Sequence, residues 1–128
     1  MEISIRKTLA PKVKPNENNL IFGHSFTDHM FIMDYTEGQG WHDGCIVPYG
    51  PLTLDPSTMV FHYAQETFEG LKAYKTATGD IQLFRAKDNI ARLNQSNERL
   101  CIPTLNEEDV MQAITSLVKI DEAWIPKA

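Results

Sequence analysis

Hydrophobic and polar residues alternate most regularly between residues 71 and 85. In "LKAYK", Leu71 and Ala73 fall on one face, whereas Lys72 and Tyr74 fall on the other. The segment "IQLFR" repeats this alternation after the turn-forming residues "TATGD". A period of two is typical of a strand with one buried face, and two such runs around a turn predict a β-hairpin over residues 71–85.

Helical periodicity replaces this alternation towards the end of the chain. A first helix is predicted over residues 88–100, with Asp88 as its N-cap. Its core-facing positions share one helix face: Ile90, Leu93, Asn97 and Leu100. A second helix is predicted near residues 107–120, capped by Thr104 or Asn106. Its apolar stripe is regular: Val110, Met111, Ile114, Leu117 and Val118.

The rest of the chain is rich in short apolar runs and turn residues. Residues 29–36 predict a strand, residues 37–44 ("EGQGWHDG") a turn, and residues 45–61 short extended pieces interrupted by prolines. Strands first and helices later favour an α+β fold, with a mainly antiparallel sheet and helices packed on one side. We expect an N-terminal arm over residues 1–21 and one small domain over residues 22–128.

The stretch "FHYAQETFEGLKAY", residues 61–74, fits neither a single helix nor a single strand. We expect its first residues to close the preceding extended segment, and residues 64–70 to form a short helix. Gly70 then ends that helix in a left-handed conformation, which glycine adopts without strain. On such a helix Glu66 and Glu69 form the solvated face, although an acid/base pair is an alternative interpretation.

Composition excludes several classes of protein. The chain has 128 residues, a net charge of −5 and a pI near 5.3, and its twelve basic residues are scattered. A nucleic-acid partner is therefore not expected. No apolar run has the length of a membrane span, and the N-terminus has no signal-peptide core. Cys45 and Cys101 are far apart and indicate two reduced thiols in a cytoplasmic protein.

Histidine and carboxylate residues gather near the predicted first strand. His24, Asp28 and His29 could in principle bind a metal ion, but their spacing matches no known ligand pattern. We therefore expect no metal site, and expect Asp28 and His29 to satisfy backbone groups where the strand begins.

Arg92 is a charged residue whose position is compatible with two roles. It lies about 200° around the helix from Ile90, so it points away from the apolar face. An arginine in this position is most often simply exposed to solvent. A planar guanidinium can also hold a phosphate through two hydrogen bonds, and spacing does not decide between these roles.

Three long segments resemble the branched-chain amino acid aminotransferases, which are pyridoxal-phosphate enzymes of fold type IV. They are "FGHSFTDHM", "GWHDGCIVPYGPLTLDPSTMVFHYAQETFEGLKAY" and "IQLFRAKDNIARLNQSNERLCIP", and the resemblance extends from Phe22 to Pro126. It implies the small N-terminal domain of a cytoplasmic, homodimeric transferase of branched-chain amino acid biosynthesis. Such an enzyme moves an amino group between Leu, Ile or Val and 2-oxoglutarate.

The resemblance also implies roles for four residues. Arg92 matches the arginine that binds the cofactor phosphate. Phe22 and Phe68 would form apolar walls of the substrate pocket, and Tyr63 would reach towards the active site of the partner subunit. Aromatic faces suit Leu, Ile and Val because they bury apolar area with little conformational entropy to lose.

The chain departs from the family by what it lacks. The family's cofactor-binding lysine precedes a Gly-Gly-Asn-Tyr motif, and none of the eight lysines here has that context. We therefore expect no catalytic residue in this chain, no activity of the chain by itself, and a boundary inside a longer protein. Two alternatives stay open. One is a sister fold type IV enzyme (D-amino acid aminotransferase or aminodeoxychorismate lyase), and the other is a free-standing ligand-binding or interaction domain.

Overall fold

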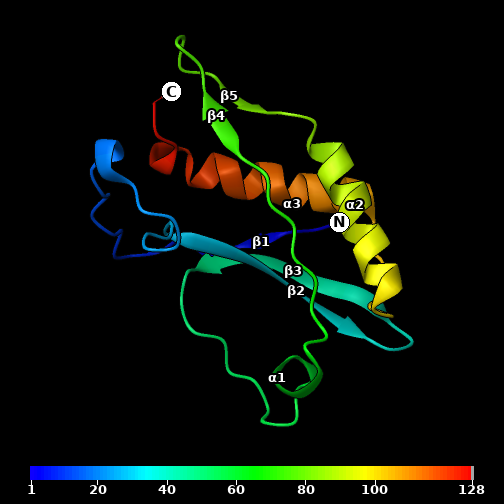
Figure 1. Ribbon diagram of the computed structural model, residues 1–128. Coiled ribbons are helices and arrows are strands. Elements are labelled where there is room, and N and C mark those ends of the chain that lie inside the picture. Colours follow the sequence, from blue (N-terminus) through cyan, green and yellow to red (C-terminus); the bar gives the residue numbers. More distant parts are fainter. Residues whose placement is uncertain (128) are drawn as a thin grey trace.

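The computed structural model describes residues 1–127 and has an α+β architecture (Figure 1). The elements follow in the order β1 (Ser4–Ile5), η1 (Glu17–Asn19), β2 (His29–Thr36), β3 (Gly40–Pro48), α1 (Met59–Tyr63), β4 (Ala73–Lys75), β5 (Ile81–Leu83), α2 (Ala86–Arg99), α3 (Glu107–Ile120) and η2 (Glu122–Trp124). None of the helices within these residues has the length and apolar character needed to cross a membrane.

The strands form two separate sheets. In the first, β3 lies in the centre, antiparallel to β2 and parallel to β1. The second is the hairpin of β4 and β5. Antiparallel pairing therefore predominates, as predicted, and the short parallel strand β1 is an addition. Figure 1 shows α3 between the three-stranded sheet and the hairpin, with α2 at one end of α3 and on the same side of that sheet.

The core lies where the helices cover the sheet. Ile46 on β3 and Ile90 on α2 are almost completely buried, and Ala86 on α2 and Ala113 on α3 are buried as well. Between β2 and α3 a small apolar hollow of about 180 Å³ remains. Its lining residues come from both layers: Met1, Phe31, Met33, Leu105, Val110, Ala113, Ile114 and Leu117. Burial of apolar area between one sheet face and one helix stripe holds these layers together.

The elements with the clearest periodicity are confirmed. The strand at residues 29–36 is β2, and the hairpin of residues 71–85 pairs Ala73 with Leu83. The two long helices are present at almost their predicted bounds. Asn106 is the N-cap of α3, because its Oδ1 accepts a hydrogen bond of 3.0 Å from the backbone N–H of Asp109.

Two predicted boundaries are wrong. Helix α2 begins at Ala86 rather than after Asp88, and Arg85 precedes it in a left-handed conformation with φ 50°. Ala86 is buried, so the first turn of the helix packs against the core and the helix begins earlier than predicted. The predicted turn at residues 37–44 is shorter than expected, because β3 already begins at Gly40, whose positive φ closes a tight turn.

The stretch of residues 61–74 differs most from expectation. Its first residues belong to helix α1 instead of an extended segment, and residues 64–70 form no helix. Ala64, with φ 49°, takes the left-handed position that was predicted for Gly70. Nε2 of His62 lies 2.7 Å from the carbonyl oxygen of Pro56, and this contact joins α1 to the turn that precedes it.

Candidate functional site

Residues 65–70, which we call the 65–70 strip, run along helix α2 in the opposite direction. The side-chain amide of Gln65 donates a 2.9 Å hydrogen bond to the carbonyl of Leu100 at the end of the helix. The hydroxyl of Thr67 lies 2.5 Å from Oδ1 of Asn97, one turn earlier and fully buried. The strip is therefore fastened to the helix by side chains and not by regular secondary structure.

Glu69 is the residue of the strip that binds Arg92. The guanidinium donates two hydrogen bonds to this carboxylate, from Nε to Oε2 at 2.7 Å and from Nη2 to Oε1 at 2.5 Å. The side-chain amide of Asn89 donates to Oε1 of Glu69 at 3.1 Å and to the carbonyl of Gly70 at 2.9 Å. The backbone N–H of Gly70 also donates to Oε1, at 2.9 Å. Three donor groups thus converge on one carboxylate.

These donors keep Glu69 ionised. The paired Arg92 guanidinium, together with the Asn89 amide and the Gly70 N–H, lowers the pKa of Glu69 from 4.5 to about 2. The carboxylate in turn raises the pKa of Arg92 above its ordinary value. The Glu69 side chain is only 12% exposed, whereas that of Arg92 is 65% exposed. The carboxylate is therefore enclosed, and the arginine keeps an open side.

The strip explains the polar interruption in the sequence. Gln65, Thr67 and Glu69 face the helix, and the intervening Glu66 and Phe68 face solvent. The interpretation of Glu66 and Glu69 as one solvated helix face is therefore wrong, because Glu69 points inward. The period-two spacing of the three polar side chains was the signal available in the sequence.

A hollow of about 520 Å³ lies on the exposed face of α2 beside Arg92. It is lined by four further residues of that helix: Gln95, Ser96, Glu98 and Arg99. Within residues 1–127, Nη1 of Arg92 donates no hydrogen bond. An exposed guanidinium with unused N–H groups fits a phosphate, which accepts two parallel hydrogen bonds from such an edge.

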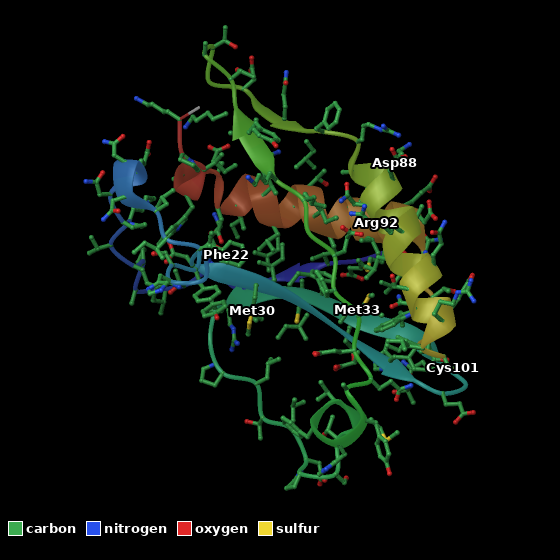
Figure 2. All side chains as sticks on the ribbon, viewed as in Figure 1. Phe22, Met30, Met33, Asp88, Arg92 and Cys101 are labelled. Atoms are coloured by element: carbon green, nitrogen blue, oxygen red, sulfur yellow. The ribbon has the colours of Figure 1, made fainter. Side chains whose placement is uncertain are left out.

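The predicted aromatic residues do not line the hollow beside Arg92. Phe22 is completely exposed, at the rim of a hollow of about 750 Å³ that lies against β4 and the C-terminal residues. Figure 2 shows Phe22 near the start of β2 and Arg92 on helix α2. Tyr63, at the end of α1, is 74% exposed, and Phe68 is 92% exposed. This chain presents the four predicted residues on its surface and does not gather them into one pocket.

Asp28 and His29 have the structural role that was expected of them. The backbone N–H of Lys12 donates to Oδ1 of Asp28 at 2.8 Å, and that of Thr8 donates to Nε2 of His29 at 3.0 Å. Nδ1 of His29 lies 2.7 Å from Oδ1 of Asp121, and both side chains are buried. Among residues 1–127 no group of three or more metal-binding side chains occurs. These residues fasten the N-terminal arm to β2 and to the end of α3.

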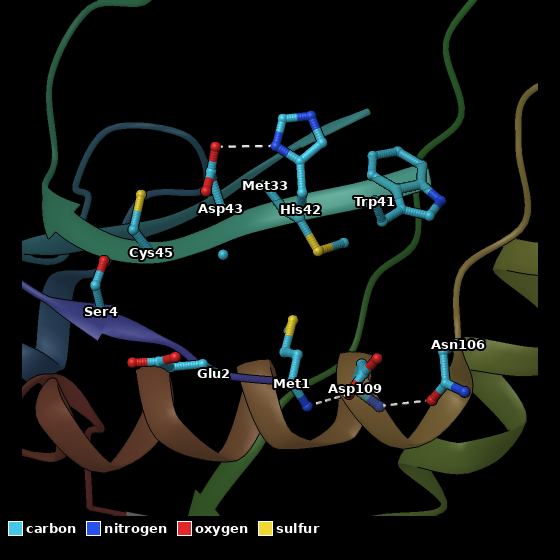
Figure 3. Close-up of a pocket in the computed structure, with 11 residues that line it drawn as sticks. Met1, Glu2, Ser4, Met33, Trp41, His42, Asp43, Cys45, Asn106 and Asp109 are labelled. Atoms are coloured by element: carbon cyan, nitrogen blue, oxygen red, sulfur yellow. Dashed lines mark hydrogen bonds and ion pairs between the residues drawn. The ribbon is translucent and has the colours of Figure 1, made fainter. Parts of the chain in front are cut away.

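Another hollow, of about 660 Å³, lies between β3 and the first turn of α3 (Figure 3). Its histidine, His42, is fully engaged: Nδ1 lies 2.9 Å from Oδ2 of Asp43, and Nε2 lies 2.9 Å from Oγ1 of Thr36. The N-terminal amine of Met1 is held by Asp109. None of the four predicted site residues lines this hollow, and His42 and the Met1 amine already have partners within the protein.

Comparison with known proteins identifies close relatives. No protein-family model matches the chain. It is 52% identical over 126 residues to branched-chain-amino-acid aminotransferase 2 of Bacillus subtilis (strain 168), which covers 98% of this chain and 35% of that protein. It is 55% identical over 125 residues to branched-chain-amino-acid transaminase 1 of the same organism, with the same two shares. A branched-chain-amino-acid aminotransferase of Mycobacterium tuberculosis (strain ATCC 25618 / H37Rv) is 43% identical over 132 residues.

The chain spans about 35% of the length of the curated relatives it matches. Within that span the similarity covers nearly every residue. The resemblance to branched-chain amino acid aminotransferases that the sequence motifs indicate is therefore confirmed for this region.

Proposed function

We propose that this chain, which matches branched-chain amino acid aminotransferases over nearly its whole length, is the small domain of such an enzyme. Residues 1–21 would form its arm and residues 22–128 its fold type IV domain. The observation that carries the proposal is Arg92, held by Glu69 with one edge open, at the position where the motifs imply a phosphate-binding arginine. The sequence identity of 43–55% to aminotransferases also supports it.

The reaction of the complete enzyme would be amino transfer between Leu, Ile or Val and 2-oxoglutarate. When bound, pyridoxal phosphate supplies the electron sink that makes the substrate α-proton removable. A second domain would supply the lysine that carries the cofactor, and a second subunit would complete the homodimer. A cytoplasmic location, expected from the thiols of Cys45 and Cys101, stays a prediction.

In this enzyme the small domain would bind and orient and would not transfer the proton. Arg92 would hold the cofactor phosphate through charge-assisted hydrogen bonds. Phe22 and Phe68 would cover the substrate side chain, and Tyr63 would extend towards the neighbouring subunit. The large exposed area of these aromatic side chains supports such a role, because it is available for burial against other parts of a complete active site. Their faces would exclude water from an apolar substrate.

The full-length protein tests this function directly. We expect it to transfer the amino group of leucine to 2-oxoglutarate. The apoenzyme of Arg92→Ala should bind pyridoxal phosphate at least tenfold more weakly, since each charge-assisted bond contributes on the order of 1.5–3 kcal/mol. Arg92→Lys should restore only part of that loss, because lysine has no planar fork.

Arg85→Ala is the matched control, because Arg85 also lies at helix α2 and its ion pair with Asp88 is largely exposed. It should leave cofactor binding unchanged. Unchanged binding in the Arg92→Ala apoenzyme would remove the phosphate role, and failure to use leucine would remove the proposed reaction.

A further inference from the structure

The guanidinium of Arg92 has two edges that can each bind an oxyanion. The side edge consists of Nε and Nη2, and both of these atoms donate to Glu69. The end edge consists of Nη1 and the second N–H of Nη2. Within the described chain nothing accepts a hydrogen bond from Nη1, and the side chain is largely exposed. Only the end edge is therefore open to a ligand.

Glu69 is held in place by groups other than Arg92. The Asn89 side chain and the Gly70 backbone both donate to its Oε1, and little of the carboxylate contacts solvent. A carboxylate fixed in this way acts as a rigid support for the longer and otherwise flexible arginine. The planar fork of arginine transmits that fixed orientation to its opposite edge.

We propose that Glu69 is a positioning residue for the cofactor phosphate, because it fixes the Arg92 guanidinium with its end edge directed outward. This inference rests on the proposed function. An arginine already held in one orientation loses less conformational freedom when a phosphate binds, so the affinity is higher than for a mobile side chain.

The negative charge of Glu69 opposes this benefit, because it also repels a phosphate. The phosphate would contact the end edge, whereas the carboxylate lies against the side edge, so their separation exceeds either contact with the guanidinium. Coulomb energy falls with distance, and solvent around an exposed pair weakens the longer interaction further. We expect the gain from orientation to exceed this weakened repulsion.

The test measures binding of pyridoxal phosphate and of pyridoxal, which has no phosphate, to the full-length apoenzyme. Glu69→Gln should weaken binding of pyridoxal phosphate by roughly tenfold, about the effect of one charge-assisted hydrogen bond, and leave pyridoxal binding unchanged. Glu66→Gln is the matched control from the outward side of the same strip, and it should change neither affinity. An equal loss for both ligands would indicate a general structural role and overturn the inference.

Asn89→Ala provides a second variant should Glu69→Gln fold poorly. Alanine suits a helix, and the change removes a donor to Glu69 without touching Arg92. A smaller loss in the same direction, again confined to the phosphorylated ligand, is expected. Unchanged or tighter binding in both variants would overturn the inference.

A double-mutant cycle separates this inference from the proposed function. In the Arg92→Ala background, Glu69→Gln should cost little further affinity, because Glu69 acts through that arginine. Full additivity would overturn the inference while the phosphate role of Arg92 stands. If Arg92→Ala alone leaves pyridoxal phosphate binding unchanged, the proposed function and this inference both fail.

Discussion

The 65–70 strip and the segment around Phe22 carry predicted site residues in opposite ways. In the strip, three polar side chains are fastened to helix α2, and they hold Arg92 through Glu69. Around Phe22, apolar side chains lie exposed at the rim of an open hollow. The strip is held by hydrogen bonds to other residues of the chain, whereas the apolar side chains around Phe22 are exposed to solvent.

This difference follows from the kind of ligand that each region would bind. A phosphate is recognised through hydrogen bonds, whose strength falls steeply when donor and acceptor are misaligned, so its arginine binds better when it is already oriented. An apolar substrate side chain is recognised through buried area, which has no preferred direction. An apolar wall such as Phe22 can therefore be completed by other parts of an active site.

The largest difference should appear between a buried residue of α2 and the exposed Phe22, in their effects on the stability of the 128-residue chain. Ile90→Ala should lower the free energy of unfolding by about 2–5 kcal/mol, because it opens a cavity where α2 meets the core. Phe22→Ala should change it by less than about 0.5 kcal/mol, since the ring is fully exposed. Chemical denaturation measures both. A large loss in Phe22→Ala would show that its segment is packed in solution and would remove the contrast.

Phe68 should separate function from stability. In the full-length protein, Phe68→Ala should lower kcat/KM for leucine by roughly tenfold or more, because burial of a phenylalanine side chain contributes about 1.5–3 kcal/mol. The stability of the 128-residue chain should stay unchanged, since Phe68 faces solvent. Phe84→Ala is the control, because Phe84 is an exposed phenylalanine directly after β5. Equal kinetic losses in the two variants would argue against a wall at Phe68.

A substitution at Thr67 tests whether the hydrogen bonds between the strip and helix α2 contribute to stability. Thr67→Val removes the hydroxyl that bonds the buried Asn97 and leaves that amide oxygen without its donor. The expected loss is about 1–2 kcal/mol in the free energy of unfolding, measured by chemical denaturation. Thr53→Val, in an exposed loop, should have almost no effect. Equal effects would mean that the strip adds nothing to the stability of α2.

The smallest effect should be the pH dependence of the contribution that the Glu69–Arg92 ion pair makes to the free energy of unfolding. The folded-state pKa of Glu69 is about 2, below its ordinary value of 4.5, so its ion pair stabilises the fold fully above pH 4.5. That contribution decreases as the pH falls towards 2. The stability difference between the wild type and Glu69→Gln should therefore be constant from pH 7 to 5 and shrink below pH 4. A difference that persists unchanged at pH 2.5 would contradict the ion-pair origin of the contact.

Periodicity in the sequence was sufficient for elements whose faces differ clearly. The hairpin of residues 71–85 and the stripe of α3 each have one polar side and one apolar side, and both are confirmed. The strand at residues 29–36, predicted from its apolar and aromatic residues, is confirmed as well. Arg92 was placed on the outer face of its helix from helical periodicity, and it is exposed there. Its assignment to a phosphate came from resemblance to a family and stays a proposal.

The sequence by itself determined these elements and limited the cap of α3 to Thr104 or Asn106, because the deciding interactions lie within a few residues along the chain. Only the tertiary structure decided residues 64–70. Polar side chains at alternate positions there are compatible with a solvated helix face or with bonds to another element. Thr67 finds its partner 30 residues away and Glu69 finds its partner 23 residues away. A local sequence pattern gives no information about such distant partners. The packing of α2 against the core therefore decided whether residues 64–70 form a helix or bind along α2.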